Sequence, residues 1–340
     1  MKTFPLKIAL GLFASTAAFA DIYVPEGPVG SVLHLSSAYD VVDRIEGLAD
    51  VHGMAVAPKR GILITGSLTE VARDGIAKPA VVSEDDHAAH HGGSGAEVAP
   101  GTVSLVSIVD AKTHEVLRRI EVPGIVHHVA VSSDERWAIV THSLLDSVSI
   151  IDLDSGEVTA TIVTGPVPEY AAADSVTGRF FVSNAGNATI SDVDPASATV
   201  LRSIRTAGGP KHMRLLSGLR QLVVAAPGPG TVQVFDADSG AQLESYTIGG
   251  DLHGIEADAS TLYVSARGRG QVVRIDRASG TQTEAAIGPA PYHMTLTKGD
   301  LLVSSSAEPV LWVVDADSLA LKQSITTADM AHQIVVAETE

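Results

Sequence analysis

Residues 128–163 of the chain read HVAVSSDERWAIVTHSLLDSVSIIDLDSGEVTATIV. Four short stretches in this segment alternate apolar and polar residues, and clusters of Ser, Asp and Gly separate them. Alternation with a period of two is typical of strands that bury one face, and the polar clusters are typical of tight turns. The segment therefore predicts four consecutive β-strands, over 128–133, 136–142, 147–152 and 157–163.

The same four-strand unit recurs along the chain. Its first strand begins with His or Tyr, and successive starts are 76, 42, 42, 41, 40 and 39 residues apart. A period near forty with four short strands per repeat is typical of a β-propeller blade. The sequence thus predicts an all-β, seven-bladed β-propeller. The seven starts are His52, His128, Tyr170, His212, His253, His293 and His332.

The two ends of the chain are expected to share one blade. Three N-terminal segments, 21–27, 31–36 and 40–46, match strands B, C and D of the repeat but have no strand A before them. The C-terminal segment HQIVVA (332–337) is a strand A with no partner after it. Pairing these ends closes the ring and leaves no blade edge unpaired, which is how propellers protect their edges.

The first twenty residues have the features of an export signal. Lys2 and Lys7 precede an apolar run, and Ala18-Phe19-Ala20 forms a small-residue cleavage box before Asp21. Such a segment is too short for a membrane anchor and is typical of a secretory signal peptide. We expect residues 1–20 to be removed, residues 21–340 to form a single domain without a membrane span, and the protein to be periplasmic.

The composition limits the chemistry that is available. The chain of 340 residues has no cysteine, which excludes disulfides, iron–sulfur clusters and thiolate metal sites. Any metal must therefore have nitrogen or oxygen ligands. The formal net charge of −17 disfavours binding to nucleic acid and to anionic lipid and attracts cations.

One long spacing between repeats marks an insertion at about 68–101, between strands B and C of one blade. Its centre reads SEDDHAAHHGGSGAE and carries His87, His90 and His91 among acids and glycines. It has no apolar period, so we expect a flexible segment. In an up-and-down blade the B–C turn lies on the same face as the start of strand A, and the insertion is therefore expected near the repeat starts.

The repeat starts themselves are expected to ring the mouth of the central channel, because the innermost strands line it. Neutral imidazole is a standard ligand for zinc and also suits copper and other divalent metals. An alternative is that these imidazoles only satisfy backbone groups at a crowded channel entrance. His34 and His114 are expected away from the mouth. The candidate metal ligands are His52, His87, His90, His91, His127, His128, Glu169, His212, His253, His293 and His332.

These repeats resemble the YVTN-type seven-bladed propellers over essentially the whole mature chain. Within that group, the DHAAHHGG loop, the histidine-rimmed channel and the lack of cysteine resemble the AztD-type periplasmic zinc chaperones. The resemblance implies that zinc is the bound metal and that a mobile histidine segment takes part in its transfer. It also implies a protein partner, the periplasmic zinc-binding protein of an ABC importer.

Enzymatic and cofactor-binding propellers are the alternative. Related propellers include lactonases that use Arg, His and Glu at the channel mouth, a group that holds haem through an axial histidine, and a copper-cluster reductase. The sequence shows no Ser-His-Asp constellation, no carboxylate pair at a recognisable spacing and no Cys-based haem attachment. We therefore expect a zinc-binding metallochaperone and not an enzyme.

Overall fold

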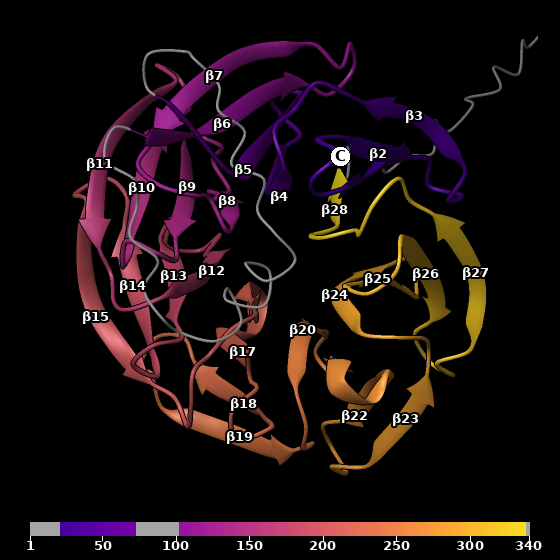
Figure 1. Ribbon diagram of the computed structural model, residues 1–340. Helices are drawn as coiled ribbons and strands as arrows, with labels where there is room; N and C mark the ends of the chain where they lie inside the picture. Colours follow the sequence, from indigo (N-terminus) through magenta and orange to yellow (C-terminus); the bar gives the residue numbers. More distant parts are fainter. Residues whose placement is uncertain (1–20, 73–101, 338–340) are drawn as a thin grey trace, which may run out of the picture.

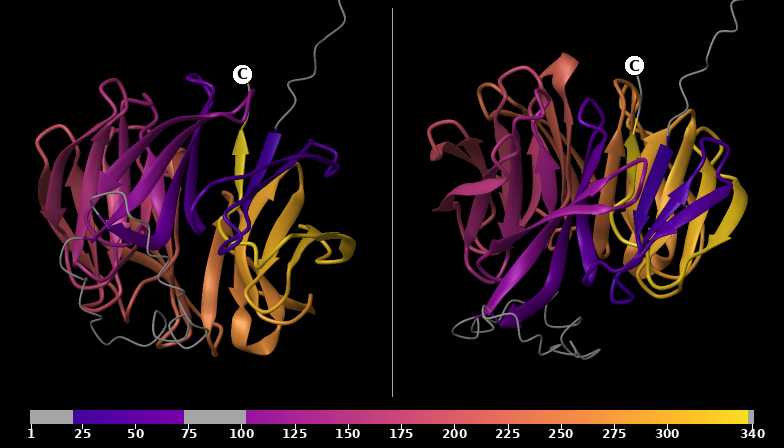
Figure 2. Two further views of the ribbon diagram at one scale, coloured as in Figure 1. Left: turned by 45° about the horizontal axis from the view of Figure 1, so that its top comes forward. Right: turned by 90° about the horizontal axis from the view of Figure 1, so that it is seen from above.

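The computed structural model describes residues 21–72 and 102–337. The described strands form seven antiparallel four-stranded sheets arranged as blades around a central axis (Figure 1). This confirms the predicted seven-bladed β-propeller. Figure 1 shows the first strand of each sheet, strand A, nearest the axis, and Figure 2 shows the sheets standing side by side around it. The first three blades are blade I, β28 (Val335–Ala337), β1 (Asp21–Pro25), β2 (Val32–Leu35) and β3 (Val41–Ile45); blade II, β4 (Val51–Ala57), β5 (Ile62–Ala72), β6 (Thr102–Asp110) and β7 (Val116–Val122); and blade III, β8 (Val129–Val131), β9 (Trp137–His142), β10 (Ser147–Asp152) and β11 (Glu157–Val163).

The remaining four blades follow the same order from the axis outward. Blade IV is β12 (Pro168–Ala173), β13 (Phe180–Asn184), β14 (Thr189–Asp194) and β15 (Thr199–Arg205); blade V is β16 (Met213–Leu216), β17 (Gln221–Ala226), β18 (Thr231–Asp236) and β19 (Gln242–Thr247); blade VI is β20 (Leu252–Ala257), β21 (Thr261–Ala266), β22 (Gln271–Asp276) and β23 (Gln282–Ala286); and blade VII is β24 (Pro291–Thr297), β25 (Asp300–Ser305), β26 (Val310–Asp315) and β27 (Leu321–Thr326).

Blade I closes the ring as the sequence predicts. Its inner strand β28 pairs antiparallel with β1, and Ile22 lies opposite Val336 in this register. Strand A therefore comes from the C-terminus and strands B to D from the N-terminus, which gives both edges of β1 a partner.

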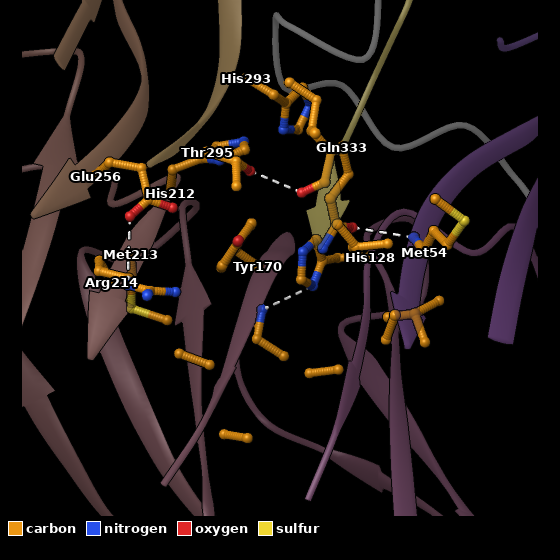
Figure 3. Close-up of a pocket in the computed structure, with 18 of the residues that line it drawn as sticks. Met54, His128, Tyr170, His212, Met213, Arg214, Glu256, His293, Thr295 and Gln333 are labelled. Carbon is orange, nitrogen blue, oxygen red and sulfur yellow. Dashed lines mark hydrogen bonds and ion pairs between the residues drawn. The ribbon is translucent and has the colours of Figure 1, made fainter. Parts of the chain in front are cut away.

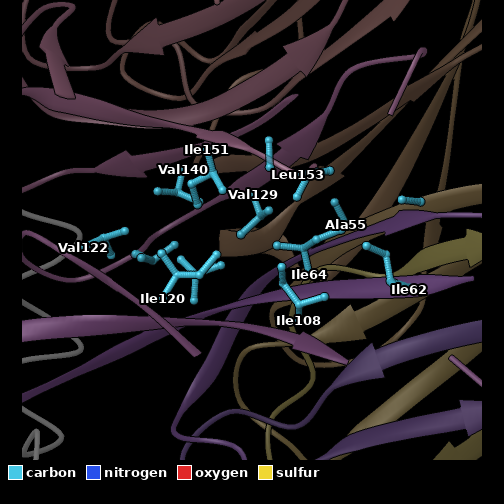
Figure 4. Packing of buried hydrophobic residues seen from close by; sticks show 14 residues of the cluster. Ala55, Ile62, Ile64, Ile108, Ile120, Val122, Val129, Val140, Ile151 and Leu153 are labelled. Atoms are coloured by element: carbon cyan, nitrogen blue, oxygen red, sulfur yellow. The ribbon is translucent and has the colours of Figure 1, made fainter. Parts of the chain in front are cut away.

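The apolar faces of neighbouring blades pack against each other. One such cluster lies between blades II and III, where Ile64 and Ile108 of one blade meet Val129 and Val140 of the next (Figure 4). The alternation seen in the sequence supplies these faces, because every second residue of a strand points to the same side. The interfaces between blades are thus the core, and they fix the inner strands around the channel.

The C–D turns show the chemistry expected of the repeated Asp-x-x-Ser-Gly. In blade III, Asp152 Oδ1 accepts the backbone N–H groups of Asp154 and Ser155 at 2.9 Å each. Gly156 then has φ +66°, in the left-handed region that glycine adopts at little cost. These aspartates hold turns and are not catalytic carboxylates.

Strand β5 is longer than the other B strands and includes the predicted start of the insertion at Leu68. The end of β5 also pairs with β6, with Glu70 opposite Ser104 and Ala72 opposite Thr102. His87, His90 and His91 lie outside the described residues, as does the segment 1–20.

Two short 3-10 turns, η1 (Ser217–Leu219) and η2 (Arg267–Arg269), are the helical segments among residues 21–72 and 102–337. In these residues, no helix is both long enough and apolar enough to span a bilayer.

Candidate metal centre

The starts of the inner strands bring the repeat residues together around the channel. Their rings follow one another, with centroid separations of 3.7 Å between His128 and Tyr170 and 4.3 Å between His212 and His253. His52 and His332 lie 4.2 Å apart across the closure. All six ring histidines are buried.

Close approach of neighbouring inner strands makes this ring tight. Gly254 follows His253, and a Cβ at Gly254 would lie 2.3 Å from the carbonyl oxygen of Tyr292 in the next blade. A Cβ at Gly53, after His52, would lie 2.8 Å from the Cα of His128. Glycine after a ring histidine therefore lets two inner strands approach more closely than any other residue would allow.

Hydroxyl groups from the B strands join neighbouring blades at the ring. Ser265 Oγ accepts the N–H of Gly254 at 2.7 Å and donates to the carbonyl of Tyr292 at 2.7 Å. Ser183 Oγ likewise accepts the backbone N–H of Tyr170 at 3.0 Å and donates to the backbone carbonyl of Lys211 at 2.7 Å.

Thr141 forms a third bridge of this kind, between His128 at 3.0 Å and the carbonyl of Glu169 at 3.3 Å. These hydroxyls were not among the residues expected from the sequence. Their signal is a Val-Ser or Val-Thr pair at the end of strand B in four repeats, Val140-Thr141, Val182-Ser183, Val264-Ser265 and Val303-Ser304.

Three of the predicted ligands converge into one cluster. His212, His253 and His293 each offer a ring nitrogen, and these three nitrogens lie within 4.8 Å of one another. They come from the starts of the inner strands of blades V, VI and VII. Ligands from three consecutive blades thus meet although 41 and 40 residues separate them in the chain.

Burial keeps two of these imidazoles neutral. It lowers the pKa of His212 and of His293 well below the usual value, and the neighbouring histidines add to the shift. A neutral imidazole has a lone pair for a metal, whereas an imidazolium has none. His293 Nε2 has no hydrogen-bond partner among the described residues, so no hydrogen bond to the protein competes with a metal ion for this nitrogen.

His127, by contrast, is engaged by one neighbour through both ring nitrogens. Its Nδ1 lies 2.8 Å from the carbonyl oxygen of Glu169, and its Nε2 lies 3.2 Å from the carboxylate of the same residue. Lys211 Nζ lies 4.0 Å from the other carboxylate oxygen. Glu169 therefore engages both ring nitrogens of His127 beside the cluster.

His128 and His142 have bonds to the backbone. His128 Nδ1 accepts the N–H of Ala171 at 3.3 Å, which leaves the proton of the neutral ring on Nε2. His142 contacts the carbonyl of Ile125 through Nδ1 at 3.0 Å and Ser149 Oγ through Nε2 at 2.8 Å. His142 therefore has the backbone-satisfying role that is the alternative to metal binding, whereas His128 has it through Nδ1 alone, since its Nε2 is buried without a hydrogen-bond partner among the described residues.

A pocket of about 500 Å³ lies in the channel beside the cluster (Figure 3). His128, Tyr170, His212 and His293 line it, and it extends along the inner strands as far as Pro58. Figure 3 shows Glu256 directed at Arg214, and Glu256 Oε2 lies 3.3 Å from Arg214 Nε. Burial raises the pKa of Glu256, and Arg214 only partly offsets this. This pair was not predicted from the sequence, because a single Glu and a single Arg in two repeats carry no spacing signal.

Solved structures share this fold at low sequence identity. The dihydro-heme d1 dehydrogenase NirN in complex with DHE has a TM-score of 0.64 at 15% identity, over 90% of this chain and 63% of that one. The periplasmic gluconolactonase PpgL of Pseudomonas aeruginosa has a TM-score of 0.69 at 15% identity, over 94% and 99%. A Bacteroides fragilis protein provisionally named a 6-phosphogluconolactonase has 0.71 at 12%, over 95% and 99%. The chain spans less than two thirds of the first of these proteins.

No protein-family model matches the sequence, and no curated protein matches it. At these identities the structural likeness shows the β-propeller fold. None of these structures points specifically to the AztD-type chaperones.

The comparisons correct the expectation that the chain is not an enzyme, because propellers of the same shape are named as lactonases. That expectation was based on the absence of a recognisable catalytic spacing. In a propeller, however, the residues of one site come from different blades about forty positions apart, so local spacing is a poor guide.

Proposed function

We propose that the protein binds a divalent transition-metal ion at His212, His253 and His293, with zinc as the principal candidate. The observation that carries this proposal is the convergence of three ring nitrogens within 4.8 Å. Three imidazoles leave one position of a tetrahedral zinc site for a further ligand, and zinc–nitrogen bonds of about 2.0–2.1 Å fit donors at this spacing after small side-chain shifts. An ion held with one open position can be released to another set of ligands.

The electrostatics of the channel support binding near neutral pH. A site of ordinary imidazoles would lose affinity between about pH 6 and 7, as protons compete with the metal. The lowered pKa values of His212 and His293 move this competition to lower pH. The negative net charge of the chain attracts cations to the molecule.

We also propose that the protein is a zinc carrier, and this role involves further histidines that the sequence analysis identified. In this role, His87, His90 and His91 capture periplasmic zinc, the ring histidines hold it, and the zinc-binding protein of an ABC importer receives it. The resemblance to AztD-type chaperones supports this assignment of partner and compartment. Deletion of residues 80–97 is expected to slow transfer to such an acceptor while the channel centre still binds zinc.

A second candidate is hydrolysis of a small ester or lactone in the channel. The pocket of about 500 Å³ supports it, because it places the buried Glu256 in the same chamber as the histidine cluster. A carboxyl group with a raised pKa is suited to proton transfer. The names of the gluconolactonases that share the fold add a substrate class. Lactone turnover by the metal-free and zinc-loaded protein, with Glu256→Gln as control, tests this candidate.

Equilibrium dialysis with metal analysis tests the principal proposal. The purified protein should retain at least one zinc per chain at micromolar free zinc. The variant with His212, His253 and His293 all replaced by Ala should retain one fewer. Retention of less than one zinc by the unaltered chain, or the same retention by both proteins, would contradict the proposal.

A further inference from the structure

A second group of histidines lies away from the channel centre. His34 is on β2 of blade I, and His114 is in the turn between β6 and β7 of blade II. Their ring centroids are 5.4 Å apart with an interplanar angle of 86°. Both rings line a pocket of about 450 Å³, together with Asp21, Asp43 and Lys112. Two imidazoles and two carboxylates from two blades thus share one cavity.

Each of these histidines has a carboxylate at one ring nitrogen. Asp43 Oδ2 lies 2.9 Å from His114 Nδ1, and Asp21 Oδ1 lies 3.2 Å from His34 Nε2. The hydrogen bond with Asp43 orients the His114 ring and makes Nε2 of that ring the better metal ligand. Both ring nitrogens of His34 are buried and have no hydrogen-bond partner among the described residues, so Asp21 lies near Nε2 without a hydrogen bond to it. The side chain of His34 is only 10% exposed, so these nitrogens do not face bulk water.

The backbone at His114 is in the left-handed region. Its φ is +63°, and it occupies the C–D turn position that Gly156, Gly240 and Gly280 fill in three other blades and Ala198 and Leu319 in two. A non-glycine residue in the left-handed region costs about 1 kcal/mol or more. The turn would accept glycine at lower cost, so backbone geometry does not explain the histidine.

His34 also departs from its repeat position. It precedes the β-bulge between strands C and D, where four other blades have the buried apolar residues Ile108, Ile150, Val234 and Val313 and blade IV has the buried Asp192. Asp192 is paired with Arg179 and Arg202, and the His34 ring stacks on Tyr23 with centroids 4.6 Å apart. The unpartnered Nδ1 of His34 costs free energy unless a ligand occupies it.

We propose that this pocket is a second site for a divalent transition-metal ion, bound by His34 Nδ1 and His114 Nε2 with water completing the shell. Two imidazoles on one tetrahedral zinc have ring centroids roughly 5 Å apart, given zinc–nitrogen bonds of about 2.0–2.1 Å, and the observed separation of 5.4 Å agrees with this. Nitrogen and oxygen donors of this kind suit zinc and its first-row neighbours.

The location of this second site relates it to the channel. Val56 and Pro58 line both the 450 Å³ pocket and the channel pocket, so the two cavities adjoin at the end of β4. His52 is at the other end of the same strand, about 20 Å away at the usual rise per residue of a strand. The second site therefore lies beside the far mouth of the channel, and the three-histidine cluster lies at the opposite end.

Substitutions taken from the chain's own repeats test this proposal without altering the channel. His114→Gly restores the turn residue of three other blades, and His34→Val introduces the residue found in two. The double variant should fold and should bind one zinc fewer per chain than the unaltered full-length protein in equilibrium dialysis with Zn²⁺ alone. Ala198→Gly changes the same turn position of blade IV, where φ is +52°, and should leave the zinc count unchanged.

The outcomes separate this site from the channel centre. The triple Ala variant of His212, His253 and His293 should lose its own zinc and keep the one at His34 and His114. An unchanged zinc count in the His34→Val/His114→Gly variant overturns the second site whatever the channel variant shows. If the double variant unfolds, His114→Gly alone decides, since a drop in zinc affinity of tenfold or more is expected from that change.

Discussion

The two sides of the histidine ring have the same residue type at the same repeat position but different surroundings. On one side, His212, His253 and His293 direct ring nitrogens at one another. On the other side, His128 accepts a backbone N–H and the adjacent His127 pairs with Glu169. The repeat alone therefore does not decide what an imidazole does.

The residue before the ring position also differs between the two sides. Glu169 precedes Tyr170, and its carboxylate contacts His127, which is itself the residue before His128. In blades V and VII the corresponding residues are Lys211 and Tyr292, which offer no acceptor carboxylate to a ring nitrogen. The acid thus lies on the side of the ring opposite to the three converging histidines.

The largest effect is expected from removing a ligand on the cluster side. His212→Ala should weaken zinc binding about a thousandfold, since loss of a residue that only orients a ligand already costs about 10–100-fold. His128→Ala should weaken it less than about tenfold, because its Nδ1 is bonded to Ala171. Competition with a zinc chelator measures both. Equal losses in the two variants would show that the ring acts as one undivided set.

Acid should destabilise the metal-free protein. The pKa values of His128, His142, His212 and His293 are lowered, by burial first of all, and that of His142 to about 4. Below about pH 6.5 the unfolded chain takes up protons that the folded chain does not, so this contribution to stability is complete above that pH and decreases as the pH falls. At pH 6.0 each group costs about 0.8 kcal/mol, and the four cost roughly 3 kcal/mol.

Urea unfolding at pH 7.5 and 6.0 measures this loss. The control is His128→Phe, which removes one of the four buried groups and should make the difference between the two pH values smaller by about 0.8 kcal/mol. If the variant and the unaltered protein lose the same free energy, the rings are not the source of the acid sensitivity.

The fold could be predicted from the sequence more completely than the site. The forty-residue period and strand alternation gave the seven blades, and the missing strand A gave the closure between β28 and β1, because both depend on local pattern and chain order. The positions of the ring residues at the starts of the inner strands could be predicted for the same reason. The grouping of His212 with His253 and His293 could not, since it is set by the direction of side chains that lie in three different blades.

Glu169 should matter for stability more than for metal binding. Glu169→Gln replaces the buried carboxylate that contacts His127 and Lys211 with a neutral amide. We expect a loss of about 2 kcal/mol in the free energy of unfolding, because a hydrogen bond to a charged group contributes about 1.5–3 kcal/mol. Urea unfolding measures this loss. A zinc affinity that falls as far as in His212→Ala would instead make Glu169 part of the metal centre.

The smallest effects are expected from the hydroxyl bridges, and they distinguish the two sides most directly. Ser265→Ala and Thr141→Val each remove one bridge and leave a buried carbonyl without its donor, so each should cost about 1 kcal/mol of stability. Ser265 holds the strands that carry His253 and His293, so its loss should also weaken zinc binding about tenfold. Thr141 holds the strands of His128 and Glu169, and its loss should leave zinc affinity within about twofold. Equal effects of the two variants on chelator competition would mean that the bridges position the whole ring, because a shift on one side would then propagate through the neighbouring inner strands to the other.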